Sequence, residues 1–232
     1  MDNTHTFRNE AFKNTRSKIM SMRKSEIIIF MIILLSFITG ICFYSQMPEK
    51  MASHWNTQGQ VNGYMSKFWG LFLLPFILIG LGLLFVVIPK IDPLKANIEK
   101  FRKYYDGFII LFFIFMVAIY SQIILWNIGI KISPNIMLSI GLGALFFYTG
   151  ILLENAKRNW FIGIRTPWTL SSEIVWEKTH KVGGKLFKIA GFVAFVGVFF
   201  QGYVLFFILV PVILVALYTV VYSYFEYQKE TK

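Results

Sequence analysis

The stretch FWGLFLLPFILIGLGLLFVVI, residues 68–88, contains 21 consecutive residues without a charged side chain. A helix that crosses a membrane needs about 20 predominantly apolar residues, so this stretch is long enough to span a bilayer. Five further stretches of the chain have the same character. The sequence therefore predicts an all-α integral membrane protein with six transmembrane helices, over residues 27–44, 68–88, 108–130, 136–153, 186–201 and 203–225.

The composition excludes whole classes of soluble protein. Of the 232 residues, 56% are hydrophobic and 15% are charged, whereas soluble domains carry about 45–50% apolar and about 25% charged residues. The chain has too little polar surface for a soluble enzyme or a nucleic-acid-binding domain. Its single cysteine, Cys42, excludes an intrachain disulfide and a cysteine-based zinc cluster. No charged residue lies deep inside a predicted span, which counts against a proton pump or an ion-coupled carrier.

Lysine and arginine are distributed unevenly between the two sides of the predicted membrane protein. The six spans leave seven other segments, and alternate segments, beginning with the N-terminal one, hold 20 of the 23 Lys and Arg residues when Lys188, at the start of the fifth span, is counted with the loop before it. Cytoplasmic segments carry the excess of Lys and Arg, so we expect both termini to be cytoplasmic. This distribution accounts for the net charge of +11 without a nucleic-acid partner, and membrane lipids are the partners it implies.

The segment between the first two spans, residues 45–67, is expected on the outer side and reads SQMPEKMASHWNTQGQVNGYMSK. Trp and Tyr supply rigid contact area and His supplies a donor and an acceptor, so the segment suits a binding surface for an outer ligand. It also suits a loop that caps the bundle with Trp55 at the lipid headgroups, and chemistry alone favours this second interpretation. A metal site at His54 is weaker, because the segment has no second His or Cys.

The segment after the second span, residues 89–107, predicts an amphipathic helix that lies in the membrane interface. Asp92 is expected as its N-cap and Pro93 as its first helical residue. The apolar residues that recur at helical spacing are Leu94, Ile98, Phe101 and Tyr105.

The fourth loop, residues 154–185, is expected in the cytoplasm. Ser171 or Ser172 before an acidic residue predicts a helix start, and Gly183 and Gly184 predict its end. One face of this helix carries Glu173, Glu177 and His180. Such a face suits metal binding or acid–base chemistry. We favour a solvated face in which Glu177 pairs with Lys181, because no nucleophile or second His supports a site.

The same loop contains three tryptophans and two arginines: Trp160, Trp168, Trp176, Arg158 and Arg165. Aromatic residues and arginines together are typical of a protein-docking surface. The alternative is that the rings dock on the bundle while the basic groups meet anionic lipid headgroups. The residues alone leave both interpretations open.

Three segments carry a resemblance to a known family. They are PEKMASHWNTQGQVNGYMSK (48–67), PKIDPLKANIEKFRKYYDGF (89–108) and NWFIGIRTPWTLSSEIVWEKTHKVGGKLF (159–187). Together they resemble the SdpI family of bacterial membrane proteins, in which an N-terminal domain of unknown function often precedes the family region. We expect residues 1–26 to form a basic cytoplasmic extension, 27–107 to hold two spans with the outer loop and interfacial helix, and 108–232 to form the SdpI-like region with four spans and the cytoplasmic loop.

The resemblance implies a multi-pass protein of the bacterial cell membrane without enzymatic activity or cofactor. It implies immunity to a secreted toxic peptide that collapses the proton motive force. It also implies signal transduction, in which the protein holds a small DNA-binding autorepressor at the membrane when the toxin is present. We therefore expect toxin contact at His54, Trp55, Asn56, Gly59, Gly63 and Lys67. We expect repressor docking at Asn159, Trp160, Arg165, Thr166, Trp168, Glu173, Trp176, Thr179 and His180.

Two other functions are weighed against immunity. A small-solute or lipid transporter is compatible with six spans and with the polar residues Gln122, Asn127 and Gln201 inside or beside them. A membrane enzyme is supported only by the helical face with Glu173, Glu177 and His180.

Overall fold

The computed structural model describes residues 22–231, so most of the predicted basic extension lies outside the described residues. Six helices of the described part are long and apolar enough to cross a membrane, which confirms the predicted fold class and number of spans. Their bounds are α2 Lys24–Phe43, α3 Lys67–Ile91, α5 Arg102–Asn127, α6 Pro134–Asn155, α8 Glu173–Val196 and α9 Val204–Glu230. The connecting elements are η1 Tyr44–Gln46, β1 Lys50–Trp55, β2 Val61–Ser66, α4 Lys95–Lys100, α7 Pro167–Ser171, η2 Gly197–Phe199 and η3 Gln201–Tyr203.

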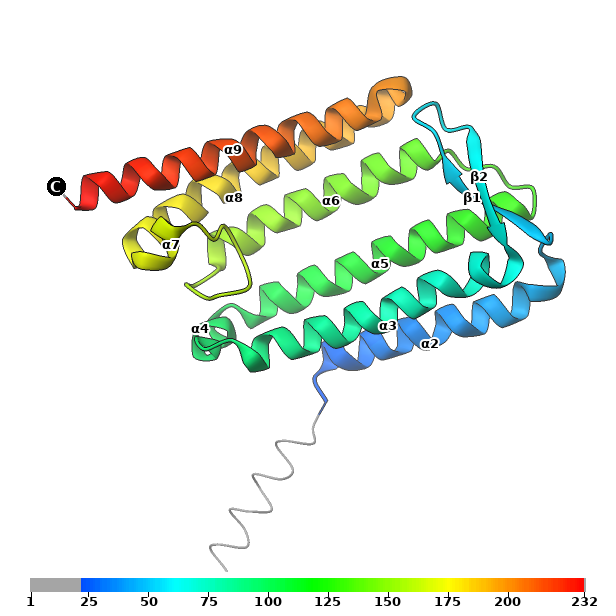
Figure 1. The fold of residues 1–232 in the computed structure, drawn as a ribbon, viewed down its shortest axis with the longest axis horizontal. Helices are drawn as coiled ribbons and strands as arrows, with labels where there is room; N and C mark the ends of the chain where they lie inside the picture. Colours follow the sequence, from blue (N-terminus) through cyan, green and yellow to red (C-terminus); the bar gives the residue numbers. More distant parts are fainter. Residues whose placement is uncertain (1–21, 232) are drawn as a thin grey trace, which may run out of the picture.

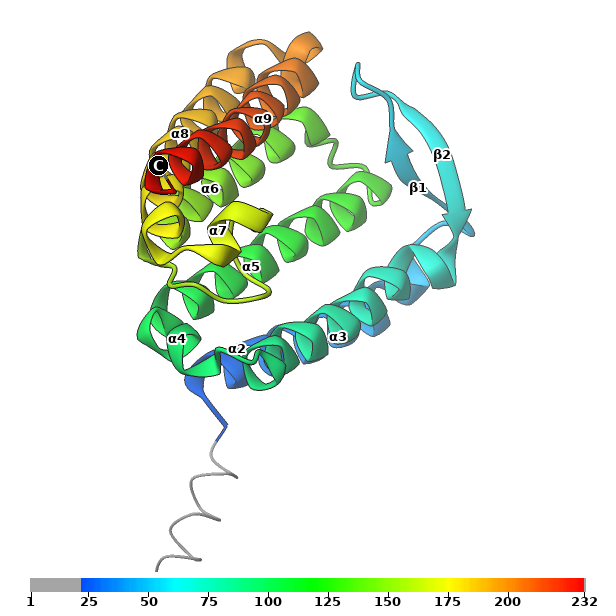
Figure 2. The same cartoon turned by 60° about the vertical axis from the view of Figure 1, so that its left-hand side comes forward.

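The six long helices form two groups of three. Helices α2, α3 and α5 contact one another and make the first half, and α6, α8 and α9 make the second half. Figure 2 shows α5 and α6 side by side between the pairs α2–α3 and α8–α9, and α5 with α6 is the main helix contact between the halves. Figure 1 shows the two strands at one end of the bundle and α4 and α7 at the other. We call these the hairpin end and the loop end.

Glycines bring α6 and α8 into close contact. A Cβ atom built on Gly150 would lie 2.4 Å from the carbonyl oxygen of Gly184, and one on Gly191 would lie 2.6 Å from that of Gly143. Only glycine permits so close an approach of two helix backbones. The prediction that Gly183 and Gly184 end a helix is therefore wrong. Instead α8 continues through them, because they serve helix packing and not chain reversal.

The start of α8 agrees with the sequence. Ser172 is the N-cap, and its hydroxyl oxygen accepts a hydrogen bond from the N–H of Val175 at 3.2 Å. The helix that begins there runs without interruption into the fifth span. Helix α8 therefore begins with polar turns that hydropathy alone assigned to a loop.

The loop between α2 and α3 forms an antiparallel hairpin of β1 and β2, which turn residues alone did not reveal. Asn56 accepts hydrogen bonds from the N–H groups of Gln58 and Gln60 within the turn, and Gly59 there has a φ of +75°. The side-chain amide of Asn127, at the end of α5, bonds both the N–H and the carbonyl oxygen of Ala52. The hairpin is thereby fixed to the first half.

Asn135, at the start of α6, fixes the same hairpin to the second half. Its Nδ2 donates to the carbonyl oxygen of Thr57 at 3.0 Å and to that of Gln201 at 2.9 Å. The turn of the hairpin, α6 and the connection between α8 and α9 therefore meet at one side chain. The hairpin thus bridges the two halves at this end of the bundle.

The segment after α3 differs from the predicted interfacial helix. Helix α4 has six residues, Phe101 interrupts the helical course, and α5 begins at Arg102. Ile98, Phe101 and Tyr105 are almost completely buried in protein. The apolar residues do recur at helical spacing, but they pack against other residues of the protein and do not face lipid. The N-cap of α4 is Leu94 and not Asp92 as predicted.

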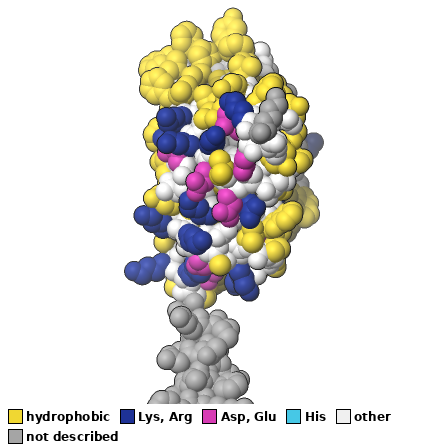
Figure 3. Space-filling view, turned by 90° about the vertical axis from the view of Figure 1, so that its left-hand side faces the viewer, with side chains coloured by type: hydrophobic (Ala, Val, Ile, Leu, Met, Phe, Trp, Pro, Cys, Tyr) yellow, Lys and Arg dark blue, Asp and Glu magenta, His cyan; other side chains and the backbone are white. Residues whose placement is uncertain are grey.

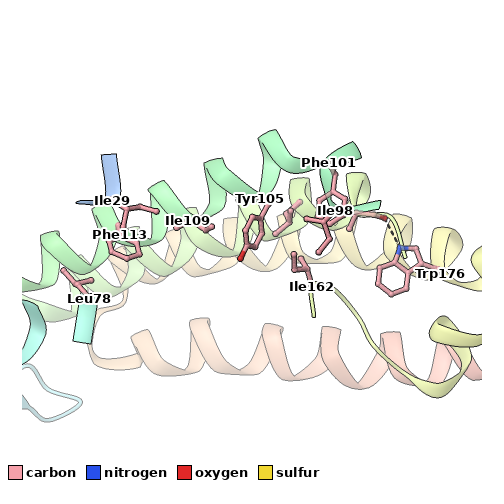
Figure 4. Close-up of a cluster of buried hydrophobic side chains, with 11 residues drawn as sticks. Ile29, Leu78, Ile98, Phe101, Tyr105, Ile109, Phe113, Ile162 and Trp176 are labelled. Atoms are coloured by element: carbon pink, nitrogen blue, oxygen red, sulfur yellow. Dashed lines mark hydrogen bonds between the residues drawn. The ribbon is translucent and has the colours of Figure 1, made fainter. Parts of the chain in front are cut away.

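The largest hydrophobic cluster lies toward the loop end and joins the two halves (Figure 4). Most of its residues come from the first half, but Leu152 comes from α6, Ala156 and Ile162 from the loop after α6, and Trp176 from α8. The indole N–H of Trp176 donates to the carbonyl oxygen of Ala156 at 2.8 Å. A side chain of the second half therefore completes the core of the first half.

Candidate functional site

A cavity of about 480 Å³ lies beneath the hairpin, between the two halves. One wall is hairpin residues 53–57, and the other walls come from three helices. The helix residues are Ile119, Gln122 and Ile123 of α5, Pro134, Asn135 and Leu138 of α6, and Leu205 of α9. We call this the hairpin cavity. Its walls are mainly apolar with a few polar groups, which is the usual composition of a ligand site.

Three of the residues expected to contact an outer ligand line this cavity. His54 is exposed, and its Nδ1 lies 2.6 Å from Oδ1 of Asn62 across the hairpin. Trp55 is half-buried and meets Trp126 edge-to-face, with ring centroids 5.4 Å apart. Asn56 uses its side chain to close the turn. Of these three, Trp55 has the largest apolar side chain.

The other three expected contact residues serve the hairpin and do not line the cavity. Gly59 lies in the turn, and Gly63 faces His54 so closely that a Cβ there would lie 2.9 Å from the Cβ of His54. The Nζ of Lys67 lies 2.6 Å from Oε1 of Glu49. These residues shape the outer segment from within.

At the loop end, residues 156–172 form a folded loop that we call the connecting loop. Asn159 is fully buried at its start and uses all its side-chain hydrogen-bonding groups. Its Oδ1 accepts from the N–H groups of Phe161 and Ile162, and its Nδ2 donates to the carbonyl oxygens of Lys157 and Ile162. Asn159 therefore fixes the local backbone.

The connecting loop is also bonded to the first half. The carboxylate of Asp92, 2% exposed, accepts from the N–H of Leu94 and, at 2.9 Å, from the N–H of Trp160. The side chain of Asn97 donates to the carbonyl oxygen of Arg158 at 2.9 Å. These bonds join the turn after α3 to the loop after α6.

His180 lies behind the connecting loop. Its ring is 2% exposed and stacks on Trp176 with centroids 3.9 Å apart. Nδ1 lies 2.8 Å from the carbonyl oxygen of Trp176, and Nε2 accepts from the N–H of Ile164 at 3.0 Å. Gly163, with a φ of +116°, passes so close that a Cβ would lie 2.4 Å from Nε2. Both ring nitrogens are therefore occupied, and the ring supports the loop.

Threonines fix the far end of the connecting loop. The hydroxyl of Thr166 accepts from the N–H of Thr169 and lies 3.0 Å from the hydroxyl of Ser223 on α9. Thr179 is fully buried on α8. His180 and Thr166 thus both attach the loop to the second half.

These positions correct the expected docking surface. Asn159, Thr166, Trp176, Thr179 and His180 are buried, so they have no surface for a partner in this structure. Their polarity serves the internal structure of the loop end. Of the two interpretations of the tryptophans, docking on the bundle describes Trp176.

Four expected docking residues remain at the surface or near it. Trp160 is 51% exposed, and Arg165 and Glu173 are exposed. Trp168 is half-buried and meets Tyr224 of α9 edge-to-face at 5.2 Å. Together these four residues define what we call the loop-end surface.

The loop end is covered by charges of both signs. Figure 3 shows Lys and Arg side chains mixed with Asp and Glu across this end, with hydrophobic side chains around them. Glu177 pairs with Lys157 at 2.8 Å, not with Lys181 as expected, because the connecting loop brings Lys157 close. Within residues 22–231, no group of three or more His, Cys, Asp or Glu side chains could hold a metal ion.

Sequence reasoning missed the residues that join the two halves at their ends. Asp92, Asn127 and Asn135 bond backbone groups far away in the chain. The one available signal was an isolated amide at the end of an apolar stretch. That signal marked Asn127 as polar but could not reveal its partner.

Two segments of the chain match described families. Residues 155–223 match the SdpI/YfhL protein family, and residues 31–79 match a domain of unknown function, DUF1648. The immunity protein SdpI of Bacillus subtilis (strain 168) is 28% identical over 207 residues, which cover 89% of this chain and 97% of that protein. No solved structure matches. The first match contains the whole connecting loop, and the second contains the hairpin.

Proposed function

We propose that this chain, whose residues 155–223 match the SdpI/YfhL protein family, is a membrane immunity protein against a secreted toxic peptide. The observation that carries the proposal is the similarity to an immunity protein along almost the whole of both chains. The six apolar helices supply the membrane location that such a role needs. The activity requires no enzyme chemistry, and the proposal assigns none.

The proposed orientation puts the hairpin end outside the cell and both termini in the cytoplasm. The excess of Lys and Arg in the segments of the loop end supports it. In this orientation the toxic peptide meets the hairpin first, with His54, Trp55 and Asn56 beside the hairpin cavity. Gly59, Gly63 and Lys67 contribute by holding the hairpin in shape.

On the cytoplasmic side we propose that a DNA-binding autorepressor docks at the loop-end surface. Trp160, Arg165, Trp168 and Glu173 offer aromatic and charged groups of the kind that protein interfaces use. The buried residues behind them act by fixing the connecting loop. Toxin at the hairpin would then bias the repressor's docking through a change in the arrangement of the two halves.

Survival across a dose series of a purified toxic peptide tests the immunity role. A strain that lacks the gene is compared with the same strain carrying it, and a dye reports membrane potential. We expect the deleted strain to depolarise at doses that the complemented strain tolerates. Coinciding dose curves would reject the immunity role.

A double variant then tests the hairpin. We expect His54→Ala combined with Trp55→Ala to lose protection while the protein still accumulates in the membrane. Trp69→Ala, which alters an exposed tryptophan of α3 away from the hairpin cavity, is the matched control. Full protection by the double variant would remove the hairpin from the mechanism.

Transport of a small solute or lipid is the second candidate, and one observation favours it. A second cavity, of about 300 Å³, lies between α3, α5, α6 and α8 near the loop end. Both cavities border the seam between α5 and α6, one toward each end. Substrate-dependent uptake by proteoliposomes that contain the purified protein would support transport.

A further inference from the structure

Trp55, which lines the hairpin cavity, has a buried hydrogen-bond donor without a partner. The indole Nε1 of Trp55 is inaccessible to solvent and has no hydrogen-bond acceptor within the described residues. An indole N–H can only donate, and a buried donor without an acceptor is costly. By contrast, the buried indole of Trp176 has its carbonyl acceptor. The difference marks Trp55 as a donor that an added molecule would satisfy.

The same cavity contains unused acceptors. Gln122 is 2% exposed on α5, and its Nε2 makes one long bond of 3.4 Å to the carbonyl oxygen of Ile132. Asn135 uses its Nδ2 for two carbonyl oxygens. Among residues 22–231, no hydrogen bond uses Oε1 of Gln122 or Oδ1 of Asn135. The two acceptors are therefore available to a ligand in the cavity, and a turn of the Trp55 ring toward the cavity would add the indole donor.

The remaining walls select for an apolar group beside the polar one. They are formed by Ile119, Ile123, Leu138 and Leu205. The cavity volume of about 480 Å³ falls within the range of about 300–1,000 Å³ that is usual for ligand sites. No charged side chain lines it, so a free carboxylate or amine would find no partner of opposite charge.

We propose that the hairpin cavity binds an apolar side chain of a peptide together with the peptide group next to it. The indole of Trp55 turns toward the cavity so that its N–H donates to a peptide carbonyl, and the side-chain carbonyl oxygens of Gln122 and Asn135 accept from peptide N–H groups. A peptide segment offers carbonyl acceptors and more than one N–H donor, which complement the one donor and two acceptors of the site. Lipid esters offer acceptors only and would leave Gln122 and Asn135 unused.

This inference rests on the proposed function, because it names the part of a toxic peptide that the protein would recognise. It also makes Gln122 a binding residue, although Gln122 lies on a membrane helix outside the hairpin. On this proposal the cavity recognises an internal peptide group and not a chain terminus. A peptide with free or blocked ends is therefore expected to bind equally well.

Indole resonances of the full chain, labelled with ¹⁵N-tryptophan in lipid nanodiscs, test the contact directly. The probe is acetyl-Gly-Leu-Gly-N-methylamide, titrated to 10 mM, about the range of a weak fragment site. We expect the Trp55 indole N–H signal, assigned by its loss in Trp55→Phe, to move downfield as the peptide binds. Trp69→Phe assigns an indole outside the cavity, and its signal is the control.

Affinity provides the second measurement. We expect Trp55→Phe and Gln122→Met each to weaken binding by about 3- to 10-fold, the usual effect of losing one hydrogen bond, and Trp69→Phe to leave it unchanged. A Trp55 signal that stays in place at 10 mM peptide would overturn the proposal. So would a signal already shifted in peptide-free nanodiscs, which would assign the donor to lipid or water.

The two proposals fail in different experiments. If peptide moves the Trp55 signal but the deleted and complemented strains show the same dose curve, immunity is wrong and the peptide site stands. If the complemented strain is protected and Trp55→Phe binds peptide as well as the parent chain, immunity stands and the site is wrong.

Discussion

His180 accepts a hydrogen bond at Nε2 from the backbone N–H of Ile164, at 3.0 Å, across the gap between α8 and the connecting loop. On its other side Nδ1 faces the carbonyl oxygen of Trp176 at 2.8 Å. A backbone N–H only donates and a carbonyl only accepts. The ring is therefore held as the neutral tautomer with its proton on Nδ1, and its role is to support the loop.

His180→Ala is expected to destabilise the protein by about 2–4 kcal/mol. The change leaves the N–H of Ile164 without an acceptor and removes the ring that stacks on Trp176. Thermal unfolding of the purified protein in detergent measures the effect. Lys181→Ala, at the exposed neighbouring position, is the control and should unfold at the parent temperature. An unchanged midpoint for His180→Ala would contradict this role.

Gly163→Ala should also lower stability, for two separable reasons. The φ of +116° is unfavourable for alanine, at about 1–3 kcal/mol, and the added Cβ would collide with Nε2 of His180. Gly129→Ala is the matched control, because Gly129 has a φ of +101° with nothing near its Cβ position. The midpoint of Gly163→Ala should fall further than that of Gly129→Ala. Equal falls would show that the contact with His180 contributes nothing.

Asn127→Ala is expected to loosen the hairpin without unfolding the helices. The N–H of Ala52 loses its acceptor, so its hydrogen exchange should accelerate about fivefold or more, the factor that corresponds to about 1 kcal/mol. Asn62→Ala removes an exposed partner of His54 and should leave exchange at Ala52 unchanged. Slow exchange at Ala52 in Asn127→Ala would mean that strand pairing alone protects it.

Asp92→Asn tests the bond between the halves at the loop end. Replacing one carboxylate oxygen by an NH₂ group sets a donor against the N–H of Leu94 or Trp160. We expect a loss of about 1–3 kcal/mol, read from thermal unfolding. Asp106→Asn, which alters a side chain that pairs with Arg102, should have a smaller effect. The reverse order would show that the buried carboxylate is not important for stability.

Trp160→Ala tests the loop-end surface. If an autorepressor docks there, toxin exposure should raise the transcript of this gene in the parent strain and not in the variant, while protection is retained. Trp69→Ala, an exposed tryptophan at the other end, should respond as the parent does. A normal transcript response in Trp160→Ala would remove this residue from docking.

The spans were predictable because their cause is local. A bilayer accepts only long apolar segments whose backbone groups are bonded within the segment, and each such segment is visible in the sequence. The hairpin was less visible, since its strands are short and its anchors, Asn127 and Asn135, lie beyond it in the chain. Nothing in an isolated amide identifies the backbone group to which it will bond.

The loop end was misjudged for a related reason. Trp176 and His180 occur among charged residues, a pattern that indicates a solvated face. Their burial depends on the connecting loop, which crosses over them from the end of α6 and supplies the N–H of Ile164. Sequence periodicity describes one helix at a time and cannot include a covering segment. The cavity beside His54, Trp55 and Asn56 could not be predicted for the same reason, because its other walls are helix residues far away in the sequence.

The two halves are joined at opposite ends of a single seam, by Asn135 to the hairpin and by Asp92 to the connecting loop. Neither half can therefore rock about the α5–α6 contact without lengthening one of these bonds. The bundle behaves mechanically as a frame closed at both ends. A movement between the two halves at the hairpin would therefore also strain the bond between Asp92 and Trp160 at the connecting loop.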